Sequence, residues 1–114
     1  MQIERQEFSD TVLLHILEPR VDAAIAVQFK DSVREMAGEN HARVVLDMSK
    51  VEFLDSSGLG ALVAALKQIG PSRTLELAAL TPTVEKVFRL TRMDTVFKIH
   101  DSAGTAIDEL AHAS

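Results

Sequence analysis

The chain has 114 residues, which is the size of one domain, and its 46% hydrophobic content is enough for a single buried core. Seventeen acidic residues against twelve Lys and Arg leave a formal net charge of −5, and no basic cluster with interleaved aromatic residues occurs, so nucleic acid is not expected as a partner. The absence of cysteine excludes disulfides and Cys-ligated zinc and fits a reducing compartment.

The N-terminal residues and the apolar segments argue against secretion and membrane insertion. Residues 1–7 carry alternating charges where a signal peptide has an apolar core. The longest apolar stretch, residues 59–66, is far shorter than the roughly 20 residues that span a bilayer. We therefore expect a soluble, cytoplasmic protein.

Two strands and a helix are predicted in the first third of the chain. Val, Leu and Ile are enriched over residues 11–17, which indicates a strand that ends before Pro19. Residues 2–8 are expected to pair antiparallel with this strand. A helix follows Asp22, because apolar residues recur at helical spacing from Ile25 onward.

The rest of the chain alternates between strand and helix patterns. The predicted elements are a strand over residues 44–48, a helix over 57–69, a strand over 74–79, a helix that opens at Thr81 or Pro82, a strand over 96–100 and a last helix capped by Ser102. Strands separated by helices of this length imply parallel pairing through right-handed crossovers. The sequence therefore predicts one α/β domain over residues 1–114, with a mixed, mostly parallel sheet of about five strands and about four helices.

The segment Asp55-Ser56-Ser57-Gly58-Leu59-Gly60 places two adjacent hydroxyls where a buried strand gives way to an apolar helix. Asp55, Ser56 or Ser57 can each cap this helix by accepting a hydrogen bond from one of its free N–H groups. The same N–H groups and the positive end of the helix dipole favour an anion, so a serine here can carry a phosphate. In both interpretations the junction exposes a serine.

The run from Val45 to Gly60, Val-Leu-Asp-Met-Ser-Lys-Val-Glu-Phe-Leu-Asp-Ser-Ser-Gly-Leu-Gly, closely resembles the signature of the STAS domain, the family of bacterial anti-sigma factor antagonists. The resemblance continues through residues 74–90 and covers nearly the whole chain. In that family the first serine of Asp-Ser-Ser-Gly is phosphorylated by the partner kinase. The resemblance therefore implies phosphorylation of Ser56, with Ser57 as the second choice because its hydroxyl is expected to cap the helix.

Two loops are expected at the carboxyl edge of the sheet, where open α/β sheets place their functional residues. One holds the Asp-Ser-Ser-Gly motif. The other is residues 19–22, where the resemblance places a Gly-x-Leu-Asp segment of the family and Pro19 stands near its glycine. Asp22 has two open interpretations, a partner contact or a cap of the first helix, and Asp55 can act as a cap, as a charge beside the phosphorylated hydroxyl, or as both. The partner-binding residues that we expect are Arg20, Asp22, Asp55, Ser56, Ser57, Gly58 and Leu59.

Gly58 and Gly60 lie inside the predicted helix, where glycine costs about 1 kcal/mol relative to alanine. Their presence predicts the close approach of another backbone. Leu59 is expected to belong to the core with partial exposure, because it lies in the first turn. The basic residues of the third helix, Lys86, Arg89 and Arg92, are interpreted as a solvated helix face.

No catalytic, cofactor or metal site is predicted. A serine nucleophile at a strand-to-helix turn requires Gly-x-Ser-x-Gly, but Leu54 and Asp55 stand where small residues are required. His100 and His112 are interpreted as core or surface residues, and no second histidine is spaced to share a metal with His15. The glycine pair of the motif lacks the third glycine of a dinucleotide site.

The resemblance implies a binding switch. In this hypothesis the unphosphorylated chain docks on an anti-sigma factor, itself a serine kinase of the GHKL type, and thereby frees the sigma factor. The kinase then phosphorylates Ser56, the pair separates, and a metal-dependent PP2C-type phosphatase resets the switch. The alternative is a permanent STAS-domain subunit, for instance of an ABC lipid-transport complex, in which the serine chemistry is incidental.

Overall fold

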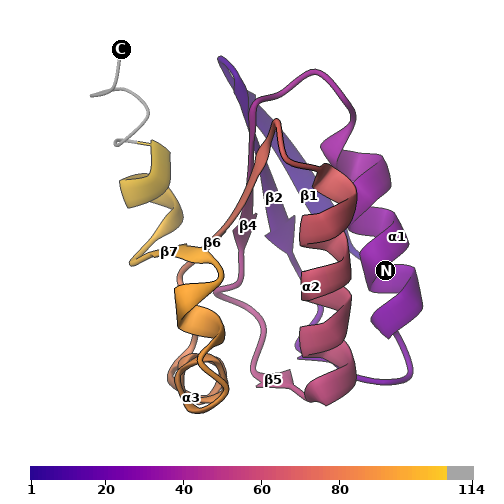
Figure 1. Cartoon of the computed structure of the whole chain (residues 1–114), viewed down its shortest axis with the longest axis vertical. Helices are drawn as coiled ribbons and strands as arrows, with labels where there is room; N and C mark the ends of the chain where they lie inside the picture. Colours follow the sequence, from indigo (N-terminus) through magenta and orange to yellow (C-terminus); the bar gives the residue numbers. More distant parts are fainter. Residues whose placement is uncertain (108–114) are drawn as a thin grey trace.

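The computed structural model describes residues 1–107, which form an α/β domain around one five-stranded sheet (Figure 1). The strands are β1 (Ile3–Phe8), β2 (Thr11–Ile16), β4 (Arg43–Asp47), β6 (Thr74–Ala78) and β7 (Lys98–His100), in the spatial order β1-β2-β4-β6-β7. β1 and β2 form an antiparallel hairpin, and every other neighbouring pair is parallel. The predicted fold class is confirmed.

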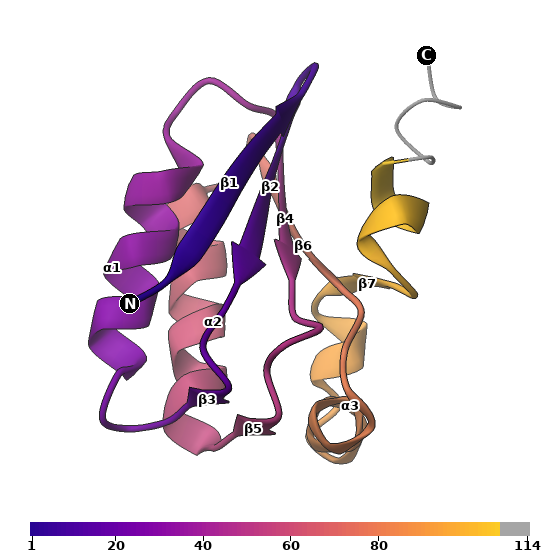
Figure 2. The ribbon, with the colours of Figure 1, turned by 180° about the vertical axis from the view of Figure 1, so that it is seen from behind.

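Helices cover both faces of this sheet, but unequally. The helices are α1 (Ala26–Ala37), α2 (Ser56–Ile69) and α3 (Pro82–Leu90), and residues 103–107 are also helical. Figures 1 and 2 show α1 and α2 side by side on one face, while residues 103–107 lie on the opposite face. The first turns of α1 and α2 therefore lie at the same end of the molecule, beyond the carboxyl ends of the parallel strands.

The main core lies between the sheet and the pair α1 and α2. Alternate residues of each strand face this layer, as period-two patterning requires. Its fully buried side chains include Val12, Leu14 and Ile16 of β2, Val44 and Leu46 of β4, and Phe29 and Val33 of α1. Removal of this apolar surface from water is the main force that holds both helices against the sheet.

A second, two-stranded parallel sheet was not predicted. It pairs β3 (Arg20–Val21) with β5 (Phe53–Leu54), and Figure 2 shows the two strands beyond the end of the main sheet. The carbonyl of Pro19 strengthens the pairing by accepting hydrogen bonds from the amides of Glu52 and Phe53, at 2.8 and 3.1 Å. Two-residue strands are too short to carry a periodic pattern, so the sequence showed both segments only as loops.

The last strand begins later than predicted. The expected strand over residues 96–100 is reduced to β7, because the short helix η1 (Met93–Thr95) continues the turn after α3 and leaves Val96 exposed. The final helix is capped as predicted, since the Ser102 hydroxyl accepts a hydrogen bond from the amide of Thr105 at 3.0 Å. His112, interpreted above as a core or surface residue, lies outside the described residues.

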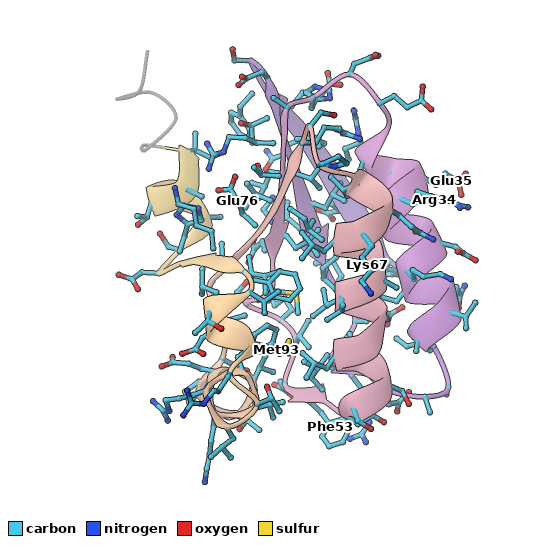
Figure 3. The ribbon with its side chains drawn as sticks, in the orientation of Figure 1. Arg34, Glu35, Phe53, Lys67, Glu76 and Met93 are labelled. Atoms are coloured by element: carbon cyan, nitrogen blue, oxygen red, sulfur yellow. The ribbon has the colours of Figure 1, made fainter. Side chains whose placement is uncertain are left out.

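A buried ionic cluster occupies the sheet face that residues 103–107 cover. Figure 3 shows Glu76 on this side of the sheet. Its carboxylate binds Arg43 through two hydrogen bonds of 2.6 and 2.9 Å and His100 Nε2 at 2.7 Å, and it accepts a bond from Thr74 Oγ1 at 2.7 Å. Burial acts to raise the pKa of Glu76, but the bonds from Arg43, His100 and Thr74 outweigh it and lower the pKa to about 2. Arg43 also donates to the carbonyl of Ala106, which links the cluster to the last helix.

Candidate functional site

Asp55 caps α2 and so fixes the geometry of the serine motif. It has extended backbone angles, and its Oδ1 accepts a hydrogen bond from the amide of Gly58 at 2.9 Å. Its carbonyl accepts the first helical bond, from Leu59 at 2.9 Å. Of the three candidate caps, the structure selects Asp55, and the prediction that Ser57 uses its hydroxyl for the cap is wrong.

Ser56 and Ser57 are the first two residues of α2, and both are exposed. Because Asp55 accepts hydrogen bonds from the amides of Gly58 and Leu59, the amides of the first turn that remain without a helical or capping bond within residues 1–107 are those of the two serines. The first turn of α2 contains no acidic residue, so the Asp55 carboxylate at the cap is the negative group that the positive end of the helix dipole meets. The prediction of an exposed Ser56 at a helix N-terminus is confirmed.

The two loops expected at this edge are joined to each other by Asp55. Its Oδ2 accepts a hydrogen bond from the amide of Ala23 at 3.2 Å, and its own amide donates to the carbonyl of Val21 at 3.4 Å. The parallel pairing of β3 with β5 joins the same two segments immediately before these bonds in the sequence. The segment that leads into α1 and the segment that leads into α2 therefore form one surface, which carries the two exposed serines.

Gly58 is the point of closest approach within this surface. A Cβ built on Gly58 would lie 2.1 Å from the carbonyl oxygen of Val21 and 2.8 Å from Cδ1 of Leu54. No side chain fits there, so glycine allows the start of α2 to pack on β3. The same expectation fails for Gly60, which is exposed and has open space around an added Cβ.

Arg20 and Asp22 lie on the outer side of β3. The Arg20 guanidinium stacks over the ring of Phe53 with its central carbon 4.2 Å from the ring centroid, and its Nε lies 3.6 Å from Asp22 Oδ2. Figure 3 shows Phe53 at the end of the molecule where α2 begins. Phe53 was missed because its contact with Arg20 depends on the β3–β5 register, which no sequence pattern reveals.

Asp22 does not cap α1. Its Oδ1 accepts a hydrogen bond from the amide of Ala24 at 3.1 Å, which closes a turn before the helix. The helix begins only at Ala26, and Ile25 precedes it without a side-chain cap. The capping interpretation of Asp22 is therefore wrong. Leu59 behaves as expected, partly exposed and packed against the main core.

His15 and His100 have hydrogen-bonded partners, whereas the buried Nδ1 of His41 has none among the residues that the structure describes. His15 Nδ1 lies 2.7 Å from Asp47 Oδ2, and its Nε2 lies 2.6 Å from Gln6 Oε1. Partial burial acts to raise the pKa of Asp47, but hydrogen bonds from Ser49 and His15 outweigh it and lower the pKa. Among residues 1–107 no three His, Asp or Glu side chains are placed to hold a metal ion. No helix in the described part of the chain is long and apolar enough to cross a membrane.

Comparison with known proteins identifies the family. The sequence matches the STAS domain over residues 2–106. A Thermotoga maritima protein, provisionally named an anti-sigma factor antagonist, is 35% identical over 78 residues, which cover 67% of this chain and 68% of the relative. The anti-sigma-F factor antagonist RsfB of Mycobacterium tuberculosis is 28% identical over 87 residues, which cover 76% of this chain and 71% of RsfB.

Solved structures agree on the fold. The anti-sigma factor antagonist SpoIIAA in its unphosphorylated form matches with a TM-score of 0.74 at 18% identity, over 97% of each chain. The phosphorylated form of Bacillus SpoIIAA matches with a TM-score of 0.64 at 18% identity, over 96% of this chain and 99% of SpoIIAA. At this identity the likeness shows the fold alone.

Proposed function

Since the chain belongs to the STAS domain family, with anti-sigma factor antagonists among its relatives, we propose that it is an anti-sigma factor antagonist switched by phosphorylation at Ser56. The observation that carries the proposal is the exposed Ser56 at the first position of α2, held in a rigid frame by Asp55 and Gly58. A kinase reaches such a hydroxyl without unfolding the domain.

The partner-binding surface is proposed to consist of the two joined segments at this end of the molecule. It comprises Arg20, Asp22, Asp55, Ser56, Ser57, Gly58 and Leu59. Gly58 is buried, and its part is to hold the exposed residues in place. Arg20 is the cation of this surface, with 61% of its side chain exposed, a contact of 3.6 Å to Asp22 and its guanidinium stacked on Phe53.

Phosphate changes this surface by charge. A phosphoserine adds about −1.5 to −2 charge and three acceptor oxygens. The phosphate would be placed beside the Asp55 carboxylate in the centre of a small docking face. A partner shaped for a neutral hydroxyl would have to bury that charge without a counterion, so the complex separates.

The proposed partners follow from the family resemblance. The chain, as one STAS domain over residues 1–114, binds an anti-sigma factor that is a GHKL-type serine kinase, and the sigma factor is released. ATP-dependent phosphorylation of Ser56 ends the interaction, and a PP2C-type phosphatase restores it. In this proposed cycle the protein acts in the cytoplasm, and it acts as a binding protein rather than an enzyme.

Phosphopeptide mapping tests the proposed site. The chain is incubated with ATP and the GHKL-type kinase encoded nearest to its gene, and we expect one phosphate on Ser56. Ser56→Ala should abolish the modification, while Ser57→Ala should leave it. A phosphate found only on Ser57, or retained in Ser56→Ala, would show that the modified serine has been assigned wrongly.

The gene neighbourhood separates the switch from the permanent-subunit alternative. A neighbouring kinase gene supports the antagonist. A neighbouring permease gene, together with stable co-purification of the chain with that permease, would instead support a transporter subunit.

A further inference from the structure

A small groove lies beside the proposed phosphorylation site. It measures about 160 Å³ and is lined by Ala26, Val27 and Lys30 of α1 and by Ser57 and Ala61 of α2. We call it the α1–α2 groove. Residues four apart lie in one row on a helix, so Ala26 with Lys30 and Ser57 with Ala61 form its two walls. The groove is open because three of its side chains, Ala26, Ser57 and Ala61, are small.

Val27 adds an exposed apolar side chain to the lining of this groove. The residue is 69% exposed, although it lies in the first turn of α1 next to Ala26, which packs partly against the core. A single exposed apolar residue is common on protein surfaces and proves nothing alone. Here, however, it lines a shallow groove that also includes Ser57, the neighbour of the proposed phosphorylated residue.

The size and charge of the groove define its occupant. Drug-sized ligands need pockets of about 300–1,000 Å³, whereas a cavity of about 150 Å³ holds a molecule the size of benzene. The groove therefore fits one apolar side chain. Lys30 supplies the charge on its wall, and its Nζ lies 3.9 Å from Asp31 Oδ1, which does not line the groove. A carboxylate next to the inserted side chain would complement that ammonium.

We infer that the α1–α2 groove receives one apolar side chain of the anti-sigma partner, with a neighbouring carboxylate of the partner bound to Lys30. The inference rests on the proposed function, because the groove continues the surface that carries Ser56. It adds α1 to the partner-binding surface, and Val27, Lys30 and Ala61 are residues that the serine motif does not contain.

A matched pair of substitutions tests the apolar part. Val27→Gln places a polar side chain in the groove, and Leu90→Gln makes the same kind of change at a 73% exposed position on α3, away from the groove. Both variants should melt within about 4 °C of wild type, because exposed substitutions rarely change stability by more than about 0.5 kcal/mol. The dissociation constant for the purified kinase that phosphorylates the chain should rise at least tenfold for Val27→Gln and less than twofold for Leu90→Gln.

A second pair tests the charge. Lys30→Met keeps the alkyl chain and removes the ammonium, and Lys86→Met is its control on the exposed face of α3. Lys30→Met should weaken binding several-fold and reduce its dependence on salt, because a charge pair across the interface is lost. Lys86→Met should change neither quantity.

The outcomes separate this inference from the proposed function. If the kinase binds wild type and Val27→Gln equally well, the inference is wrong and the antagonist function stands. If no kinase binds wild type, both fail. If wild type sediments as a dimer that Val27→Gln dissociates, a second copy of the chain fills the groove, and the partner is not its occupant.

Discussion

Two glycines, two residues apart in α2, have opposite environments. Gly58 faces the carbonyl of Val21, and Gly60 faces open space. The sequence suggested the same role for both, because glycine is unfavourable at either position of a helix. Only the packing of α2 on β3 distinguishes them.

Gly58→Ala should therefore destabilise the domain strongly. The added Cβ would lie 2.1 Å from backbone oxygen, which cannot move without breaking the β3–β5 pairing. Overpacking of this kind costs about 1–3 kcal/mol or more, and each kcal/mol lowers the melting temperature of a domain of about 100 residues by roughly 4–8 °C. Thermal unfolding followed by circular dichroism measures the change.

Gly60→Ala is the matched control for this prediction. It has the space for a methyl group and removes the entropic cost of glycine in a helix, so it should stabilise the domain by about 0.5–1 kcal/mol. Equal melting temperatures for the two variants would contradict the close approach at Gly58.

Asp55→Ala should also lower stability, for a different reason. It removes the helix cap on the Gly58 amide and the bond to the Ala23 amide, at a cost of about 1–3 kcal/mol. Ser57→Ala should stay within about 0.5 kcal/mol of wild type, because Ser57 is exposed and does not supply the cap. Urea unfolding of both variants decides which residue caps α2, and a larger loss in Ser57→Ala would reverse the assignment.

At the scale of elements, the ionic cluster of Glu76, Arg43 and His100 makes the free energy of unfolding depend on pH in the acid range. The pKa of Glu76 is about 2 in the folded domain, below its ordinary value of 4.5. A depressed pKa means that the ionised carboxylate stabilises the fold above about pH 4.5 and that this contribution is lost as the pH falls towards 2.

Glu76→Gln should remove this part of the acid dependence. The variant should be less stable than wild type at pH 7, because Arg43 and His100 lose their carboxylate partner. Its stability should then fall less steeply between pH 4.5 and 2 than that of wild type. The exposed Glu39→Gln serves as control and should follow the wild-type curve in urea titrations at several pH values. Parallel curves for Glu76→Gln and wild type would contradict the assignment.

The long elements were predictable because each buries one face along a regular period. The strand over residues 11–17 and the helix over residues 57–69 were found to within one residue, since alternation and helical spacing are visible in the sequence. β3 and β5 were not, because two-residue strands are defined by their partner rather than by a pattern. The Arg43–Glu76 pair was missed for a related reason, since its residues lie 33 positions apart and meet only through strand register.

The sequence predicted where the residues of the candidate site lie in the fold, but it did not predict which contacts they make. The motif placed Ser56 at a strand-to-helix junction, and the structure confirms this placement. Three features of the site depend on how two segments, more than 30 residues apart, meet across β3 and β5. They are the cap formed by Asp55, the close approach at Gly58 and the stacking of Arg20 on Phe53. Those contacts are tertiary, and local propensity does not encode them.

At the scale of the whole molecule, most of the contacts that stabilise the fold lie away from the proposed binding surface, although Asp55 and Gly58 belong to both. The main core and the ionic cluster lie along both faces of the sheet, whereas the serine motif, Arg20 and the α1–α2 groove lie at one end. A change at an exposed side chain of that end, such as Ser56, can therefore alter binding while the fold persists. The amides and dipole at the start of α2 even favour a negative group at Ser56.

Ser56→Asp tests this separation. We expect it to melt within about 4 °C of wild type, because an exposed acidic residue in the first turn suits the helix. Binding to the kinase should weaken by tens- to thousands-fold, since burying a second negative group beside Asp55 costs about 2–5 kcal/mol. Thr83→Asp, an exposed first-turn change on α3, should alter neither quantity. A melt and a binding titration for each variant suffice: unchanged affinity of Ser56→Asp, or collapse of its isolated fold, would remove the proposed mechanism.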